Sequence, residues 1–159
     1  MQKISIVVER KSYKLHLYSD TLLVKSYRAV FGRNNNVKKL RNDFSTPIGN
    51  YKVVSISDST EFYKYFKLNY PNKLDVGEAL KNSEITKPEF DVFVGAIKKG
   101  KYGIDNEFIG IQGLGEYDFI FKNLPFVFNW TNGSIAISND AIDELTKFIK
   151  VGTPVIIKN

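Results

Sequence analysis

The segment WTNGSIAIS, residues Trp130–Ser138, passes from an aromatic residue through a Thr-Asn-Gly turn to Ser134 and an apolar run. A hydroxyl on a glycine turn between apolar segments is one way in which a chain presents a nucleophile, and it is also an ordinary turn. A serine needs a base to become nucleophilic, and this segment lacks the S-x-x-K spacing that would supply a lysine. From this segment alone, Ser134 is a nucleophile, the remnant of one, or a turn residue.

Short alternating segments on either side predict a chain that is mainly β. In YKLHLY the alternation places Tyr13, Leu15 and Leu17 on one face of a strand. The predicted strands cover residues 4–8, 13–18, 21–32, 51–57, 107–113 and 153–158. The basic, asparagine-rich stretch 33–50 has no periodicity and predicts a loop.

Two or three helices are predicted in addition. Residues 86–100 carry a capping box, Thr86 with Glu89, followed by an apolar stripe of Phe90, Phe93, Val94 and Ile97. Residues 74–83 form a shorter candidate, and a last helix begins near Ser138 and ends at Gly152. These elements indicate an α+β fold, mainly β with some helix, in a single domain over residues 1–159.

Composition excludes several classes of protein. The 159 residues are 43% hydrophobic and 25% charged, which is typical of a globular domain. The sequence has no run of about eighteen apolar residues and no apolar leader, so neither a transmembrane segment nor a signal peptide is predicted. It also has no cysteine, which excludes disulfides, thiolate metal sites and cysteine catalysis.

Charge is distributed unevenly along the chain. Residues 1–52 contain eleven basic and three acidic residues, a balance of +8, whereas the whole chain carries +6. A basic half can attract a polyanion, or its lysines can simply cover the edges of a sheet. Both interpretations stay open, although nucleic acid is not the expected partner.

Metal and acid–base sites are not predicted. The one histidine, His16, lies on the polar side of its strand and is expected to be exposed. Without cysteine or a second histidine, the sequence predicts no metal site and no cofactor. The loop carboxylates show no spacing that separates a catalytic pair from surface charge; they are Asp58, Glu61, Asp105, Glu107, Glu116 and Asp118.

Five segments, taken in order, resemble one family. They are TPIGNYKV (Thr46–Val53), LNYPNKLD (Leu68–Asp75), IGIQGLG (Ile109–Gly115), WTNGSIAIS (Trp130–Ser138) and VGTPVII (Val151–Ile157). Together they resemble the YkuD-type L,D-transpeptidase catalytic domain, in the subgroup whose active-site segment reads W-T-x-G-C-I-A. The resemblance covers essentially the whole chain and implies a β-sandwich-like fold.

The resemblance also implies a chemistry and a location. Members of this family remodel the bacterial cell wall: a cysteine thiolate attacks a peptidoglycan stem peptide, a histidine in an I-H-G segment acts as base, and backbone N–H groups hold the oxyanion. These positions correspond here to Ser134 for the nucleophile, Gln112 for the base, and Gly133 with Ser134 for the oxyanion. The cell envelope or periplasm is the compartment that the family suggests.

Both essential residues are therefore replaced, and this predicts lost activity. An alcohol is a far weaker acid than a thiol, and a glutamine amide cannot take up a proton at neutral pH. We interpret the chain as an inactive L,D-transpeptidase-like domain that retains a peptide-binding, glycan-binding or structural role. The groove candidates are Gly113, Trp130, Thr131 and Asn132, and the expected partners are stem peptides or muropeptides.

Two alternatives remain open at this point. Ser134 can be an altered or engineered nucleophile of an active transpeptidase or carboxypeptidase, or the chain can be a polyanion-binding module. The aromatic stretch 117–130 is expected to form a loop that either closes over the groove or packs on the core.

Overall fold

The computed structural model describes residues 2–123 and 128–159, with the backbone alone at residues 59 and 60. Within this part the chain forms eight strands: β1 (Ile4–Glu9), β2 (Lys14–Ser19), β3 (Leu22–Arg28), β4 (Gly49–Thr60), β5 (Tyr63–Leu68), β6 (Gly110–Gln112), β7 (Ile135–Ala136) and β8 (Pro154–Lys158). The four α-helices of the described residues are α1 (Lys73–Lys81), α2 (Lys87–Lys98), α3 (Asp118–Asn123) and α4 (Asn139–Thr146). A short 3₁₀ turn, Gly115–Tyr117, precedes α3.

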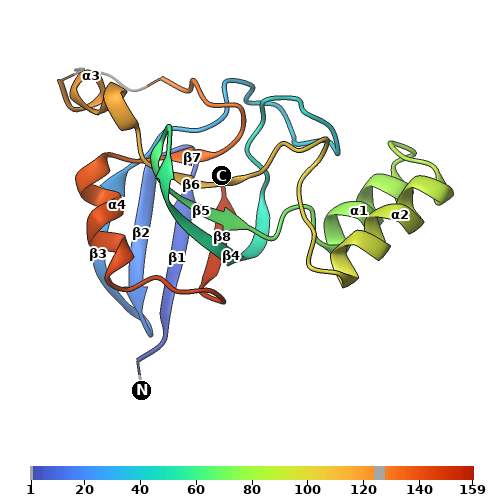
Figure 1. Cartoon of the computed structure of the whole chain (residues 1–159), viewed down its shortest axis with the longest axis horizontal. Helices are drawn as coiled ribbons and strands as arrows, with labels where there is room; N and C mark the ends of the chain where they lie inside the picture. The colour runs from blue at the N-terminus through green and yellow to red at the C-terminus, as the bar shows by residue number, and fades with distance from the viewer. Residues whose placement is uncertain (1, 124–127) are drawn as a thin grey trace.

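The strands form one mixed sheet in the order β3-β2-β1-β8-β4-β5-β6-β7 (Figure 1). Neighbouring strands are antiparallel except for the parallel pairs β1–β8 and β6–β7. The twelve-residue strand β4 belongs to both halves of the sheet: Gly49–Lys52 pairs with β8, and the segment from Val53 onward pairs with β5. The expected mainly β fold with some helix is confirmed.

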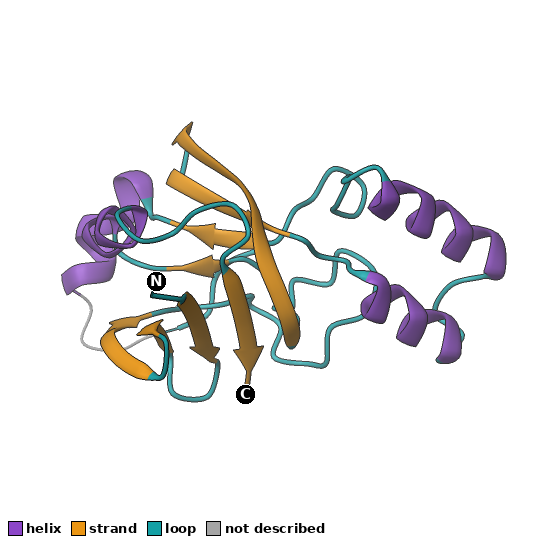
Figure 2. Cartoon of the chain, turned by 90° about the horizontal axis from the view of Figure 1, so that it is seen from below, coloured by secondary structure: helices purple, strands orange, loops and turns teal. Residues whose placement is uncertain are grey.

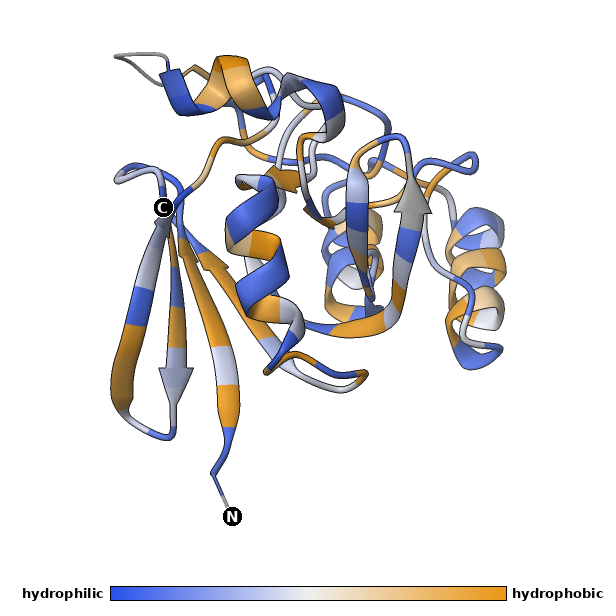
Figure 3. Ribbon diagram, turned by 60° about the vertical axis from the view of Figure 1, so that its left-hand side comes forward, coloured by the Kyte–Doolittle hydropathy of each residue, from blue (hydrophilic) through white to orange (hydrophobic). Residues whose placement is uncertain are grey.

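The main core takes side chains from both halves of the sheet. Leu15 and Leu17 of β2 are buried together with Phe66 of β5 and Ile111 of β6, and Leu145 of α4 joins them. Figure 3 shows polar and apolar residues in alternating bands along several strands, the pattern that lets a sheet bury one face. The predicted face of the strand at 13–18 is confirmed at both leucines.

Helices α1 and α2 form a hairpin that projects away from the sheet (Figure 2). Each begins with a capping box, Asn72 with Asp75 in α1 and the predicted Thr86 with Glu89 in α2. The predicted stripe of α2 packs against a small separate cluster of Val76, Ala79 and Ile85. No residue of α2 is fully buried, although Phe93 of the stripe also packs against the main core.

Several predicted boundaries are wrong. The described chain has four α-helices where two or three were expected, because α3 forms inside the stretch predicted as a loop. The strand at 21–32 ends at Arg28, since the chain then leaves β2 and bridges Val30 to Ala136. Strand β5 is absent from the predicted strands, and the last helix ends at Thr146 instead of Gly152.

The aromatic stretch 117–130 does not behave as one unit. Phe121 is buried in a small cluster with Val30 and Leu114, whereas Phe119 and Phe128 are exposed. Phe126 lies outside the described residues.

Across the described ranges, no helix is long and apolar enough to span a membrane.

Candidate functional site

The turn before Ser134 has a backbone that only glycine adopts readily. Gly133 has φ +132°, and a Cβ placed there would lie 2.8 Å from Ile109 Cδ1 and 2.9 Å from the carbonyl oxygen of Ser45. After the turn, β7 runs parallel to β6 and pairs Ile135 with Ile111. The register of this pair places Ser134 beside the strand that carries Gln112.

Two buried threonine hydroxyls tie the turn to the rest of the chain. Thr46 Oγ1 donates to the Gly133 carbonyl at 2.7 Å and accepts from the Gly32 N–H at 2.9 Å. Thr131 Oγ1 donates to the Ser134 carbonyl at 2.6 Å and accepts from the Gly133 N–H at 3.1 Å. Both threonines are almost fully buried, so each backbone group has its partner away from water.

Ser134 is 7% exposed, and its hydroxyl has three polar neighbours. Its Oγ accepts from the Gly110 N–H at 3.1 Å, lies 3.2 Å from Tyr65 Oη, and lies 3.5 Å from the Phe108 carbonyl oxygen. Burial, together with the charge of Glu107, raises the pKa of Tyr65 to about 12, although the hydrogen bond with Ser134 opposes the shift. Tyr65 is thus a neutral phenol at pH 7 and cannot take the proton of Ser134.

A cavity of about 330 Å³ opens beside this hydroxyl, and we call it the Ser134 cavity. Five predicted site residues line it together: Gln112, Trp130, Thr131, Asn132 and Ser134. Its described lining also includes Phe62, Tyr65, Asn106, Glu107 and Phe108.

The two predicted glycines lie outside the described lining. Gly113 is buried and donates its N–H to the Lys64 carbonyl at 3.0 Å, in continuation of the β5–β6 pairing. Gly133 donates its N–H to the Thr131 hydroxyl. An oxyanion role for Gly133 would require that this bond be released, and the role stays a prediction.

Positive groups stand next to the cavity. Arg33 Nη2 donates to Asn132 Oδ1 at 2.7 Å, and Lys67 Nζ lies 3.7 Å from the centroid of the Phe108 ring. Both Asn132 and Phe108 belong to the lining, so two cations stand beside the rim against one lining carboxylate, Glu107, and this excess of positive charge favours an anionic ligand.

His16 takes no part in this site. Its Nε2 lies 2.8 Å from Glu9 Oε1 and its Nδ1 lies 2.6 Å from Ser26 Oγ, both on the sheet half formed by β1, β2 and β3. The expected exposure of His16 is wrong, because its side chain is only 15% exposed. Within residues 2–123 and 128–159, no group of three or more histidine and carboxylate side chains could hold a metal ion.

The sequence did not predict the two closest partners of the Ser134 hydroxyl, Tyr65 and the Gly110 amide, nor the lining residues Phe62, Asn106 and Phe108. The segment YKYFKL, Tyr63–Leu68, alternates as a strand does, and this signal could have revealed β5. It could not have revealed that Tyr65 pairs with Gln112 in the sheet, because the two are far apart in sequence. Glu107, considered only as surface charge, is exposed and lines the cavity.

Comparison with known structures gives the same fold. Bd1075 from Bdellovibrio bacteriovorus has 19% identity and a TM-score of 0.61, with 98% of this chain and 48% of that chain covered. The helical cell shape determining protein Pgp2 from Campylobacter jejuni has 17% identity and a TM-score of 0.66, with 99% and 48% covered. An L,D-transpeptidase from Xylanimonas cellulosilytica has 14% identity and a TM-score of 0.57, with 98% and 60% covered.

The chain thus spans about half the length of the first two structures. At these identities the likeness concerns the fold alone. A comparison with curated protein sequences gives no match. The model of the L,D-transpeptidase catalytic domain, YkuD, matches residues 3–157, which is nearly the whole chain. The chain therefore belongs to the YkuD family of L,D-transpeptidase catalytic domains.

Proposed function

We propose that this chain is an L,D-transpeptidase domain that binds peptidoglycan stem peptides without transferring their acyl group. The observation that carries the proposal is the environment of Ser134: its hydroxyl lies at a formed cavity, held by the Gly110 N–H and the Tyr65 phenol. An N–H donor has no basicity, and a phenol with a pKa of about 12 is protonated at neutral pH. Neither group can activate the serine.

Gln112 supports the same conclusion. It lies in β6 beside the strand that follows Ser134, and it is only 4% exposed. Its amide donates and accepts hydrogen bonds but takes up no proton, and the described lining of the cavity contains neither histidine nor lysine. The one carboxylate of the described lining, Glu107, is not among the hydrogen-bond partners given for Ser134 Oγ, which are Tyr65, Gly110 and Phe108. An alcohol without a base in hydrogen-bond contact is a poor nucleophile, so acyl transfer from a stem peptide is not expected.

The cavity nevertheless keeps the properties of a binding site. Its volume of about 330 Å³ is at the lower end of ordinary ligand sites, which span roughly 300–1,000 Å³. Trp130 and Phe62 supply aromatic surface, with ring centroids 6.5 Å apart. Gln112, Asn132 and Thr131 can pair with peptide groups, while Arg33 and Lys67 beside the rim suit the carboxylates of a stem peptide.

Binding can be measured without a label, because Trp130 is the single tryptophan of the sequence and lines the cavity. We expect a tetrapeptide stem to change Trp130 fluorescence with a saturable curve. The Asn132→Ala variant should weaken binding several-fold through the lost hydrogen bond, whereas Asn36→Ala, an exposed loop change outside the described lining, should leave it unaltered. The absence of binding at millimolar peptide would exclude this function.

Chemistry is tested separately by intact-mass spectrometry. The parent chain should form no acyl adduct with the tetrapeptide and release no D-alanine. The double variant Ser134→Cys with Gln112→His should form an acyl adduct if the cavity retains the family geometry. An acyl adduct on Ser134 of the parent would instead establish a serine enzyme and overturn the proposal.

A further inference from the structure

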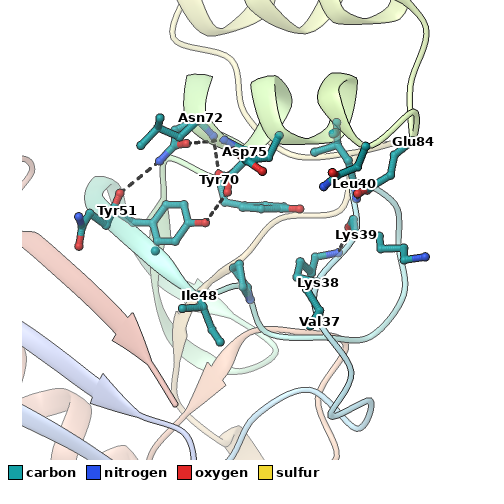
Figure 4. Close-up of a pocket in the computed structure, with 17 residues that line it drawn as sticks. Val37, Lys38, Lys39, Leu40, Ile48, Tyr51, Tyr70, Asn72, Asp75 and Glu84 are labelled. Carbon is teal, nitrogen blue, oxygen red and sulfur yellow. Dashed lines mark hydrogen bonds between the residues drawn. The ribbon is translucent and has the colours of Figure 1, made fainter.

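A second and larger cavity, of about 610 Å³, lies between the α1–α2 hairpin, the loop 33–48 and the start of β4 (Figure 4). We call it the hairpin cavity. It shares no described lining residue with the Ser134 cavity, and a small cavity of about 20 Å³ lies between the two, lined by Lys38 and Tyr70 on one side and by Glu107, Phe108 and Asn132 on the other. Its volume is in the middle of the range of ordinary ligand sites.

One wall of the hairpin cavity carries a carboxylate in a fixed position. Tyr51 Oη donates to Asp75 Oδ1 at 2.8 Å, and the Asn72 N–H donates to Asp75 Oδ2 at 2.9 Å as part of the capping box of α1. The Tyr51 and Tyr70 rings pack edge to face with centroids 5.9 Å apart. Figure 4 shows the two tyrosines and Asp75 grouped together at the α1 side of the cavity.

The described lining of the hairpin cavity carries more acidic than basic residues, three against two. Glu78 and Glu84 line it together with Asp75. The pKa of Tyr70 is raised first by burial and then by the charges of Asp75, Asp43 and Glu84, so three separate carboxylates act at this ring. A negative potential in a concave site favours a cationic ligand.

The wall already holds one ammonium group, that of Lys38. Its Nζ donates to Asp43 Oδ1 at 2.7 Å and to the Lys39 carbonyl at 3.0 Å, and it lies 5.4 Å from the centroid of the Tyr70 ring. The combination of carboxylate, carbonyl and aromatic face is thus suited to an ammonium ion. Because Asp43 offsets the Lys38 charge, the lining keeps an excess of negative charge from Asp75, Glu78 and Glu84, which exposed Lys39 reduces only in part.

From this geometry we propose that the hairpin cavity binds a peptide side chain that ends in a primary ammonium group, of the lysine type. The ammonium lies toward Asp75, Glu78 and Glu84, and the aliphatic stem lies against Ile48 and Ala79. A metal ion would need convergent ligands, and the described carboxylates form no such group. An ammonium group on a flexible stem has three rotatable donors and can be bound without such convergent ligands.

The test is a ¹⁵N–¹H NMR titration of the full chain with Nα-acetyl-lysine N-methylamide. The matched probe is the Nα,Nε-diacetyl analogue, which has the same stem and no charge. We expect the charged probe to shift the amides of Asn72, Asn82 and Gly49 in the hairpin cavity, and the neutral probe to bind at least about fivefold more weakly. Equal binding of the two probes, or shifts confined to the Ser134 cavity, would refute the proposal.

A charge-neutralising variant provides the second readout. Glu78→Gln with Glu84→Gln removes two charges, and the amide introduced at position 84 keeps an oxygen for the Leu40 N–H, from which Glu84 Oε1 accepts at 3.0 Å. The dissociation constant of the charged probe should rise about three- to tenfold. Glu116→Gln, a carboxylate change outside the described lining, should leave it unchanged. No response to the double change in a folded protein would also contradict the proposal, whatever happens at Ser134.

Discussion

The Thr46→Val substitution tests whether the Ser134 turn depends on one buried hydroxyl. Valine has nearly the shape of threonine, so the change removes the hydroxyl without leaving a large cavity. Thr46 Oγ1 donates to the Gly133 carbonyl at 2.7 Å and accepts from the Gly32 N–H at 2.9 Å, and Thr46 is 0% exposed. Both backbone groups would lose a partner in a place that water does not reach.

An unsatisfied buried polar group costs roughly 1–3 kcal/mol, so two of them predict a loss of about 2–6 kcal/mol in the free energy of unfolding. That is a large part of the total stability of an ordinary domain, about 5–15 kcal/mol. Urea unfolding followed by Trp130 fluorescence measures the loss, because Trp130 lies close in sequence to the turn.

Thr46→Ser is the matched control. It keeps the hydroxyl and deletes one methyl group, which should cost only about 1 kcal/mol. If Thr46→Val remains within about 0.5 kcal/mol of the parent, or if both variants lose the same stability, the two hydrogen bonds do not hold the turn and the reasoning fails.

Three further predictions concern pH, a buried ion pair and a glycine. Because the pKa of Tyr65 is about 12 when folded and about 10 when unfolded, its contribution to stability is complete below pH 10 and is lost as pH rises through 12. The loss reaches about 3 kcal/mol, and Tyr65→Phe should flatten the alkaline limb of a stability curve measured in urea by that amount. Lys38→Met should lower the free energy of unfolding by about 3–5 kcal/mol, because it leaves the Asp43 carboxylate, which is 7% exposed, without its cation. Lys39→Met changes an exposed neighbouring residue and should stay within about 0.5 kcal/mol of the parent in the same urea experiment. Equal losses for the two lysines would contradict the role of the pair. Gly133→Ala should destabilise by about 2 kcal/mol or more in calorimetry, through its positive φ and the close approach of Ile109, while Gly95→Ala in α2, with open space around it, should stabilise by about 0.5–1 kcal/mol.

Local patterns predicted the elements that local interactions decide. The capping box at Thr86 and the alternation around Leu15 and Leu17 depend on residues a few positions apart, and both are present as expected. The end of β3 at Arg28 could not be predicted in this way, because it depends on the bridge between Val30 and Ala136, which are far apart in sequence.

The candidate site shows the same limit. The resemblance located Ser134 and Gln112, and the structure brings them to one cavity with Trp130. The partners that decide the chemistry of the Ser134 hydroxyl, Tyr65 and the Gly110 amide, come from strand pairing across long sequence separations. No periodicity in a short window contains that information.

The position of β8 has a consequence for the synthesis of the chain. β8, the last of the eight described strands in sequence order, lies in the interior of the sheet, where it pairs with β1 and with β4. While the ribosome is still adding residues before Pro154, the two halves lack the strand that joins them. Completion of the sheet therefore waits until β8 has left the ribosomal exit tunnel, and until then the edges of β1 and β4 that face β8 lack their partner strand.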